Sequence, residues 1–434
     1  MNVRWLPEPL RWAAFRTLEW LSDLKGNPAR KLPEPIAASP GPGALWLYVS
    51  TIGELNAIEP LLRHLRERLP GLAWVLITEH AHYRDAYLAK YPQAQVFITR
   101  GHSRDARHLA RRQPPALLML AEIPAWPSEG PCRFSYAFVR AAKRAGARVL
   151  LVNAWLYGYT PRCTMDRIEH SLFAHDYLSA FDFACVQNQT VADTLVTAGL
   201  GRARLQVTGN LKFDALDRQA WTPDQARSPN LLKALLEAHR PILVAGCVTD
   251  HDEMERVFDA FARLRARHPD ALLIHAPRHP EYPDNLRKIE ALAERHQLRL
   301  RFRSRIEDAP LPPDTDGLVL DTMGELRDFY AAATLAHVGV DHNILEPMSF
   351  GRPVSVSPGW HPTYPSYPVY QAMLAAGGIR ELAHAEDLAK TWIELLEQPD
   401  LYQASRDSVD GALDQARGAL KRSLDALIPF LPRP

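Results

Sequence analysis

Short apolar runs alternate with segments of helical length along most of this chain, and this alternation limits the folds that it can adopt. The runs fall at 45–49, 74–78, 96–99, 117–120, 149–152, 184–187 and 205–210, and again at 242–246, 271–275, 318–320, 335–340 and 354–356. Strands that are separated by helices pair in parallel through right-handed crossovers, so the pattern predicts α/β domains with parallel sheets. The turns that follow the strands then share one edge of each sheet, which is where ligands bind.

A break in this pattern divides the chain. At 434 residues the chain is long enough for two domains, and polar residues and prolines interrupt the alternation at 216–240, which indicates an interdomain linker. We therefore expect an N-terminal helix and proline-rich linker at 1–42, one Rossmann-like domain at 43–215, a second at 241–404 and a C-terminal helix at 405–434.

The N-terminal helix allows two interpretations. Residues 9–24 carry an apolar stripe, and Trp12 and Trp20 lie close to it. The helix either packs on its own domain or lies at a membrane surface with its aromatic face in the lipid. Both interpretations stay open at this point.

The composition bears on partners and compartment. A formal net charge of +1 gives no overall attraction to nucleic acid. The four cysteines lie far apart, which is typical of the reduced thiols of a cytoplasmic protein, and no His, Asp or Glu cluster has the spacing of a metal site. No run of about 18 apolar residues and no signal-peptide pattern is found, so we expect the protein to stay on the side of the membrane where it is made.

The stretch 324–353 carries the most specific pattern. Apolar residues recur at helical spacing at its start, a buried strand follows at 335–340, and the polar loop 341–344 opens a second helix at Leu345. A strand, a polar turn and a helix N-terminus in this order favour anionic ligands, because unpaired backbone N–H groups and the helix dipole point outward there. We expect Glu346 to face this crevice.

The same stretch resembles the signature of a known family. H-N-x-L-E-P at 342–347, followed by G-x-P and preceded by D-T-M-G-E-L at 321–326, is similar to motifs of the 3-deoxy-D-manno-octulosonic acid (Kdo) transferases. Similar strings occur in the family's order at 50–54 (S-T-I-G-E), 122–127 (E-I-P-A-W-P), 153–154 (N-A), 209–214 (G-N-L-K-F-D) and 277–281 (P-R-H-P-E). The chain departs from the family at 246–249, where G-C-V-T stands in place of G-S-T-H, and at Trp155, where the family has arginine.

The resemblance implies a fold and an activity. The fold would be GT-B, with two Rossmann-like domains around a central cleft, the donor on the C-terminal domain, the acceptor on the N-terminal domain, and the last helix crossing back to the N-terminal domain. The activity would be inverting transfer of Kdo, or a related ulosonic acid, from its CMP ester to a lipid A precursor or related saccharide acceptor of lipopolysaccharide. The CMP-sugar is a substrate, and no metal or other cofactor is implied. The protein would be cytoplasmic, with peripheral contact to the inner membrane as an option.

The chemistry of inverting transfer assigns roles to residues within that resemblance. The reaction needs a base for the acceptor hydroxyl, which we expect to be Glu54, and a cation for the departing phosphate, which we expect to be Arg278. The alternative for Glu54 is a carboxylate that only stabilises its helix N-terminus, by ~0.3–1 kcal/mol. The other expected donor-binding residues are Gly246, Thr249, Pro277, His279, Met323, Gly324, Glu325, His342, Asn343, Leu345 and Glu346. The expected acceptor-binding residues are Ser50, Gly53, Glu122, Trp126, Asn153 and Lys212.

Structural interpretations of some of these residues stay open beside the functional ones. Asn343 would cap its helix, Lys212 would pair with Asp214, and His337, inside an apolar run, is expected to be a core histidine. Two other functions also remain. One is a UDP-sugar transferase or epimerase of the same fold, and the other is a scaffold that kept the fold and lost catalysis.

Overall fold

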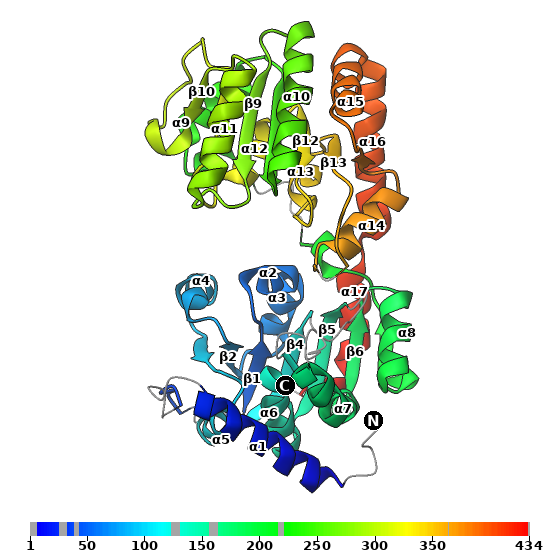
Figure 1. The fold of residues 1–434 in the computed structure, drawn as a ribbon. Coiled ribbons are helices and arrows are strands. Elements are labelled where there is room, and N and C mark those ends of the chain that lie inside the picture. The colour runs from blue at the N-terminus through cyan, green and yellow to red at the C-terminus, as the bar shows by residue number, and fades with distance from the viewer. Residues whose placement is uncertain are drawn as a thin grey trace. The chain divides into compact units, whose positions relative to one another are not determined.

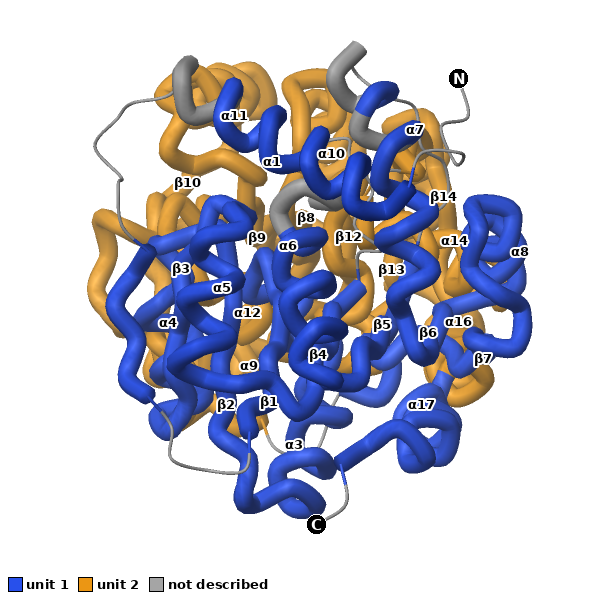
Figure 2. Tube along the Cα trace, turned by 90° about the horizontal axis from the view of Figure 1, so that it is seen from below, with its two compact units in different colours: residues 1–215, 417–434 blue, residues 216–416 orange. Residues whose placement is uncertain are grey.

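The computed structural model describes residues 7–25, 33–38, 43–122, 131–155, 164–215, 221–362 and 364–432. Its contacts divide the chain into two compact units, which Figure 2 shows in different colours. Unit 1 comprises residues 1–215 and 417–434, and unit 2 comprises residues 216–416.

The described residues of unit 1 form a parallel sheet of seven strands in the order β3-β2-β1-β4-β5-β6-β7. The strands are β1 (Ala44–Tyr48), β2 (Ala73–Thr78), β3 (Gln95–Ile98), β4 (Pro115–Ala121), β5 (Arg148–Ala154), β6 (Phe183–Val186) and β7 (Leu205–Val207). The chain adds β2 and β3 on one side of β1 and then returns to add β4 on the other side. The winding direction thus reverses between β1 and β4, and the carboxyl ends of the strands at such a reversal are the usual ligand site of an open α/β sheet.

Helices bury both faces of this sheet. They are α1 (Glu8–Lys25), α2 (Ile52–Ala57), α3 (Glu59–Arg68), α4 (Arg84–Lys90), α5 (Ser103–Arg112), α6 (Pro131–Arg144), α7 (Thr164–Ser179), α8 (Gln189–Ala198) and α17 (Ala419–Leu427). Side chains alternate along β1 between the two resulting cores: Trp46 belongs to the core that includes Phe138 of α6, and Leu47 to the core that includes Leu61 of α3. A strand that is covered on both faces reads as a continuous apolar run, which explains the sequence pattern.

Helix α1 packs against α6 and α7 of its own unit (Figure 1). Phe15 is fully buried, the Arg11 guanidinium pairs with the Asp176 carboxylate at 2.6 Å, and the Ser103 hydroxyl donates to Glu19 at 2.7 Å. The helix therefore adopts the packed arrangement, as the first interpretation expects. None of the described helices is long and apolar enough to cross a membrane.

The described residues of unit 2 form a second parallel sheet of seven strands in the order β10-β11-β9-β8-β12-β13-β14. The strands are β8 (Ile242–Val248), β9 (Leu272–Pro277), β10 (Leu300–Phe302), β11 (Gly317–Val319), β12 (Leu335–Val338), β13 (Val354–Val356) and β14 (Arg380–Glu381). The helices are α9 (Pro229–Glu237), α10 (His251–Arg267), α11 (Pro283–Arg295), α12 (Leu326–Ala332), α13 (Leu345–Ser349), α14 (Tyr367–Ala375), α15 (Ala385–Glu397) and α16 (Pro399–Ala416). Here the winding reverses between β8 and β12.

Helices α10, α11 and α15 cover one face of the second sheet, and α10 and α15 lie side by side in Figure 1. Phe258 and Phe261 of α10 share a buried core with Ile289 of α11 and Trp392 of α15. This core holds β8 and β9 rigidly, so it fixes the turns that follow those strands.

Two expectations about the connections need correction. The segment 216–240 is not only a linker, because α9 buries Leu231, Leu232 and Leu235 and belongs to unit 2. The expected C-terminal helix is two helices, since Gly418 lies at φ 90° between α16 and α17. Its backbone N–H donates to Asp214 at 2.8 Å, which helps to anchor α17 on unit 1. Asp214 therefore caps a helix, and it is not the partner of Lys212.

Candidate active site

Glu54 lies in the first turn of α2, directly after the end of β1. Thr51 caps this helix by accepting a hydrogen bond from the Glu54 N–H at 3.2 Å, and the Glu54 carboxylate accepts one from the Ser50 N–H at 2.6 Å. This arrangement is close to a capping box, which a T-x-x-E sequence favours, except that the carboxylate accepts from the residue before the N-cap. The structural interpretation of Glu54 therefore fits its hydrogen bonds, and a catalytic role must rest on its other properties.

Those other properties are burial and charge. Glu54 is 6% exposed, and its pKa rises from the ordinary 4.5 to about 8. Burial is the largest cause, the negative charges of Glu122 and Glu79 add to it, and the hydrogen bond from Ser50 opposes it. A carboxyl group with a pKa near neutrality is a stronger base than an ordinary one, which is the property that general base catalysis needs.

A buried polar network occupies the same sheet edge, after β4, β5, β6 and β7. The Lys212 ammonium lies 3.0 Å from the Glu122 carboxylate, to which the Asn153 amide also donates at 2.9 Å. Asn153 donates to Asn210 at 3.2 Å, and Asn210 donates to Gln187 at 3.1 Å. The network thus joins four strand ends through side chains that are buried or half-buried, and such networks fix one arrangement when every member has a partner.

Backbone strain marks two members of this network. Glu122 has φ 62° and Asn153 has φ 54°, in the left-handed region that costs a residue with a side chain ~1–3 kcal/mol and is frequent at functional turns. The network therefore brings together Glu122, Asn153 and Lys212 of the expected acceptor residues. Gly53 is exposed in α2 and meets no close neighbour, and Trp126 lies outside the described residues.

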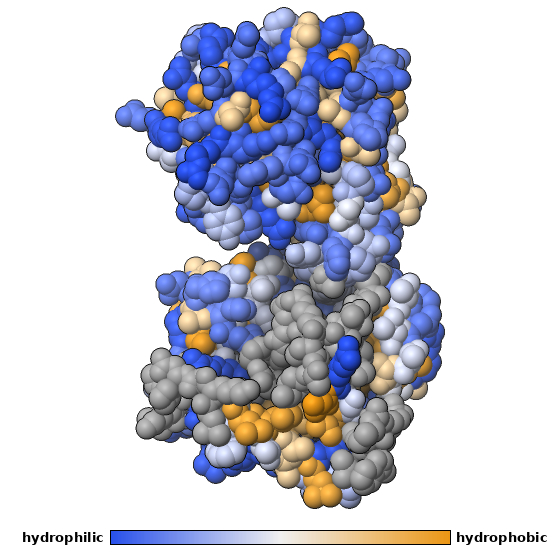
Figure 3. Space-filling model, in the orientation of Figure 1, coloured by the Kyte–Doolittle hydropathy of each residue, from blue (hydrophilic) through white to orange (hydrophobic). Residues whose placement is uncertain are grey.

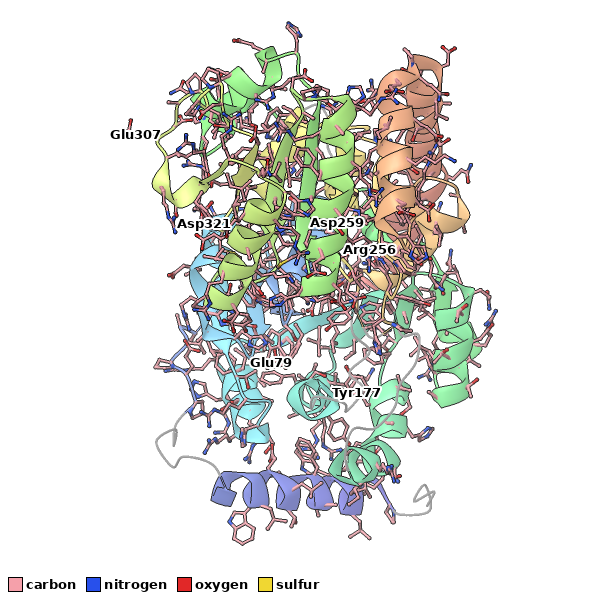
Figure 4. All side chains as sticks on the ribbon, turned by 45° about the horizontal axis from the view of Figure 1, so that its top comes forward. Glu79, Tyr177, Arg256, Asp259, Glu307 and Asp321 are labelled. Atoms are coloured by element: carbon pink, nitrogen blue, oxygen red, sulfur yellow. The ribbon has the colours of Figure 1, made fainter. Side chains whose placement is uncertain are left out.

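Glu79 is a residue of this edge that the sequence motifs did not single out. It follows β2, and the Tyr48 hydroxyl donates to its carboxylate at 2.6 Å; Figure 4 labels it among the side chains of unit 1. Its second carboxylate oxygen is buried and has no hydrogen-bond partner among the described residues. Its position directly after an apolar strand was the available sequence signal. Glu79, Glu54 and Glu122 place three carboxylates at one sheet edge.

In unit 2 the turns after β8 and β12 meet at the reversal of the sheet. A Cβ atom on Gly339 would lie 2.0 Å from the Cys247 carbonyl oxygen, so only glycine permits this approach. The Thr249 hydroxyl donates to the Val340 carbonyl at 3.0 Å and ties the two turns together. Gly246 has a similar role, because a Cβ atom there would lie 1.9 Å from the Tyr330 hydroxyl oxygen.

Buried polar groups behind these turns hold them in place. The Glu253 carboxylate is 2% exposed and accepts a hydrogen bond from the Thr249 N–H at 2.8 Å. Burial alone would raise the pKa of Glu253, but the ring of His337, whose Nε2 atom lies 3.7 Å from the carboxylate, lowers it. The other nitrogen of His337 lies 3.1 Å from the Ser355 hydroxyl. His337 is therefore a core histidine with partners, as expected.

Arg278 follows β9 at the same edge. Its N–H donates to the Val248 carbonyl at 2.9 Å, and its guanidinium lies 5.6 Å from the centre of the Tyr364 ring. Among the described residues no carboxylate lies within ion-pair distance of it. Burial and then the Arg278 charge lower the pKa of His342 to about 4, and the Nε2 atom of His342 is buried without a partner in the described part of the chain. This edge thus offers a guanidinium that pairs with no described carboxylate, together with a neutral imidazole, and such a pairing suits a phosphate.

Asn343 and Glu346 are bonded within the loop that starts α13. The Asn343 side chain accepts from the Leu345 N–H and donates to the Glu346 carboxylate, both at 3.2 Å. Ile344 is the N-cap residue of α13 and Asn343 precedes it, so Asn343 is not the cap that the structural interpretation expected. The Leu345 N–H, which we expected to contact phosphate, already has Asn343 as its partner. Burial raises the pKa of Glu346.

The remaining expected donor residues are engaged elsewhere in unit 2. The Glu325 carboxylate is 4% exposed and accepts from the Ser228 hydroxyl at 2.7 Å, with the Arg303 guanidinium 3.4 Å away. The Met323 carbonyl accepts from Arg227 at 2.6 Å while its side chain is exposed. This segment, with Gly324 at φ 88°, is therefore anchored on the loop before α9.

The two residues that flank Arg278 differ in their surroundings. Pro277 is buried. The His279 ring stacks on Tyr282 at 4.8 Å between centroids, and its Nδ1 atom lies 3.0 Å from Glu281. Both contacts of His279 are within its own loop. No group of three or more His, Cys, Asp or Glu side chains within the described ranges could hold a metal ion.

Known proteins resemble this chain in sequence and in fold. Residues 24–215 match the family model described as 3-deoxy-D-manno-octulosonic-acid transferase (kdotransferase). Relatives named 3-deoxy-D-manno-octulosonic acid transferase are 26% identical over 92% of this chain and 89% of the protein from Haemophilus influenzae, and 27% identical over 94% of this chain and 90% of the protein from Bordetella pertussis. The solved UDP-GlcNAc 2-epimerase from Neisseria meningitidis is 13% identical, with a TM-score of 0.61 over 89% of this chain and 99% of that one, and shows the same fold. The chain is thus similar to Kdo transferases along most of its length, and it has the GT-B fold.

Proposed function

We propose that this protein is a CMP-Kdo-dependent glycosyltransferase, which transfers Kdo or a related ulosonic acid to a lipid A precursor or related saccharide acceptor with inversion. Similarity to the Kdo transferases supports the donor and the reaction class. The observation that carries the proposal is Glu54, a buried carboxylate with a raised pKa at the reversal of the unit 1 sheet. A residue that served only as a helix cap would gain nothing from that raised pKa.

The proposed reaction proceeds in one displacement. Glu54 accepts the proton of the acceptor hydroxyl, whose oxygen then forms a bond with the anomeric carbon of the donor sugar. The bond from that carbon to the phosphate oxygen breaks, and CMP leaves with the electron pair. Attack on the face opposite the leaving group inverts the anomeric configuration. A positioned base contributes about 10²–10⁴-fold to such a step.

Arg278 is the proposed phosphate ligand of the donor. A guanidinium that has no carboxylate at ion-pair distance among the described residues keeps its donors for the phosphate oxygens, and it stabilises the negative charge that develops as CMP leaves. His342, kept neutral by burial and by Arg278, donates one N–H without adding a second charge. Glu346, whose raised pKa favours the protonated form, is the proposed partner of the ribose hydroxyls.

The network around Glu122 is the proposed acceptor side of the site. Its ion pair with Lys212 keeps an ammonium group at the sheet edge that carries Glu54. We assign Asn153 and Lys212 to binding the acceptor, and the negative charge of Glu122 to keeping the pKa of Glu54 high.

Lipid contact through α1 is part of the proposal. Leu10, Trp20 and Leu21 are 54%, 61% and 43% exposed on the packed helix, and Figure 3 shows apolar residues gathered on this face of unit 1. We propose that they bring the enzyme to the cytoplasmic face of the inner membrane, where its acceptor lies. Co-sedimentation with anionic vesicles should fall for Trp20→Ser, and a variant that sediments like the wild type would remove α1 from this role.

The function is tested by incubating the purified protein with CMP-Kdo generated in situ and a tetraacylated lipid A precursor, and then weighing the product. A mass gain of one or more Kdo residues is expected. Arg278→Gln should weaken CMP binding by roughly 10–100-fold, as the loss of a charge-assisted hydrogen bond predicts. The matched control is Arg263→Gln, which changes an exposed arginine of the same unit and should leave CMP binding unchanged.

Calorimetric titrations separate the alternatives. Binding of CMP in preference to UDP supports the proposal, whereas a preference for UDP would favour the UDP-sugar transferase or epimerase. Absence of binding to either nucleotide at millimolar concentration would favour the scaffold.

A further inference from the structure

A pocket of about 400 Å³ opens at the amino ends of strands β8 and β12 in unit 2. It lies at the sheet edge opposite the turns that carry Arg278 and His342, because those turns follow the carboxyl ends of the strands. The pocket is lined by the last residues of α9 and α12, the start of β8 and one side of α16. Arg352, which precedes Pro353, completes the lining. The lining residues are Leu235, Leu236, His239, Arg240, Pro241, Ile242, Ala331, Ala332, Ala333, Thr334, Arg352 and Tyr402.

The charge of this lining has one sign. His239, Arg240 and Arg352 are basic, and none of the lining residues is Asp or Glu. Burial is the main cause that lowers the pKa of Arg352, and the positive charge of the nearby Arg406 also lowers it. A half-buried cavity that gathers cationic groups without carboxylates favours the binding of an anion.

Structural bonds to backbone carbonyls are the simpler explanation for these arginines, and they account for Arg240. Arg240 donates to the carbonyl oxygens of Asp270, Ala271 and Thr315 at 2.6, 3.3 and 3.2 Å. Its guanidinium is therefore occupied in holding three chain segments together. Arg240 supplies charge to the pocket but few free donors.

Arg352 is different, because its donors are only partly used. One of its terminal nitrogens donates to the Ala331 carbonyl at the end of α12, and the Tyr402 side chain is a second partner. Its Nε atom is buried without a partner among the described residues. No carboxylate in the described part of the chain lies within ion-pair distance of it. A guanidinium has five N–H donors in a planar fork, so donors of Arg352 remain for an anion in the pocket.

We propose that this pocket binds a phosphate group, either as free phosphate or on a small sugar phosphate, through Arg352 and His239. The guanidinium fork matches two phosphate oxygens, and the volume lies in the range of small-molecule sites. Leu235, Pro241 and Ala333 provide an apolar wall for the body of a sugar phosphate. The site is separate from the CMP-sugar site of the proposed function and does not depend on it.

The test is a calorimetric titration of the full-length protein with inorganic phosphate and with glucose 6-phosphate, each in the presence of saturating CMP so that Arg278 is occupied. We expect one additional site for at least one of the two ligands. Arg352→Gln should weaken it roughly tenfold or more, as the loss of a charge-assisted hydrogen bond predicts. Arg263→Gln, an exposed arginine of the same unit, is the control and should bind as the wild type does.

The arms of the experiment distinguish the ligands. Tighter binding of glucose 6-phosphate than of phosphate indicates that the apolar wall contributes, and equal binding indicates a site for the phosphate group alone. If Arg352→Gln does not fold, His239→Gln, an exposed position, replaces it and should also weaken binding. Absence of a second site with both ligands, or full binding by the variants, would overturn the proposal.

Discussion

Replacing Glu54 by glutamine should remove activity and also make the protein more stable at alkaline pH. The fold holds Glu54 where its pKa is about 8, although an exposed glutamate has a pKa near 4.5. The folded state therefore favours the protonated form. Glutamine has nearly the same shape and stays neutral, and its carbonyl oxygen can still accept the hydrogen bond from the Ser50 N–H.

The sign and size of the effect follow from the two pKa values. Because the folded pKa lies above the unfolded one, the stability that Glu54 contributes is fully present below pH 4.5 and is lost as pH rises through about 8. At about 1.4 kcal/mol for each pH unit, the full loss is about 5 kcal/mol. Local relaxation lowers that figure, and we expect about 2 kcal/mol or more at pH 9.

The assay is urea unfolding of the wild type and Glu54→Gln at pH 5, 7 and 9, followed by circular dichroism. The free energies of unfolding of the two proteins should be closest at pH 5, and the difference should favour the variant increasingly at pH 7 and 9. Glu59→Gln is the control, since Glu59 occupies the first turn of the next helix and pairs with exposed Arg63. A Glu54→Gln protein that is less stable than the wild type at pH 9 would refute the reasoning.

Three further predictions concern the groups around the two sheet edges. Glu79→Gln removes a negative charge that raises the pKa of the base, so the acidic limb of the pH–rate profile should move to lower pH by roughly half a unit; an unchanged limb would exclude this influence. Lys212→Met leaves Glu122 buried without its counterion and should lower the free energy of unfolding by about 3–5 kcal/mol at pH 7, measured by urea; a loss below about 1 kcal/mol, the usual value of an exposed pair, would show that the pair is not buried. Gly339→Ala places a methyl group against the Cys247 carbonyl and should lower the melting temperature and weaken CMP binding together; normal CMP affinity would separate this turn from the donor.

The sequence predicted the two parallel sheets because most strands are covered on both faces and therefore read as apolar runs. It did not predict β10 or β14. These are edge strands of three and two residues that carry arginine, and their pairing depends on the neighbouring strand. Helix α9 was also missed, since the prolines and polar residues around it hid the stripe of Leu231, Leu232 and Leu235.

The sequence could predict those site residues whose place at the sheet edge follows from their position after a strand. Glu54 and Arg278 directly follow strands, and the sheet places such residues at its carboxyl edge. The pairing of Lys212 with Glu122 spans 90 residues, and nothing local indicates it. The side-chain partners of Glu325 are Ser228 and Arg303, which also come from distant segments and are not indicated by the local sequence.

The most direct test of the central claim is to measure transfer from CMP-Kdo and CMP affinity side by side on the wild type and on Glu54→Gln. The account predicts that the variant loses about 10²–10⁴-fold in transfer rate, keeps the wild-type dissociation constant for CMP, and folds at least as stably. A variant that still transfers Kdo at the wild-type rate would show that Glu54 only caps its helix and that the base lies elsewhere.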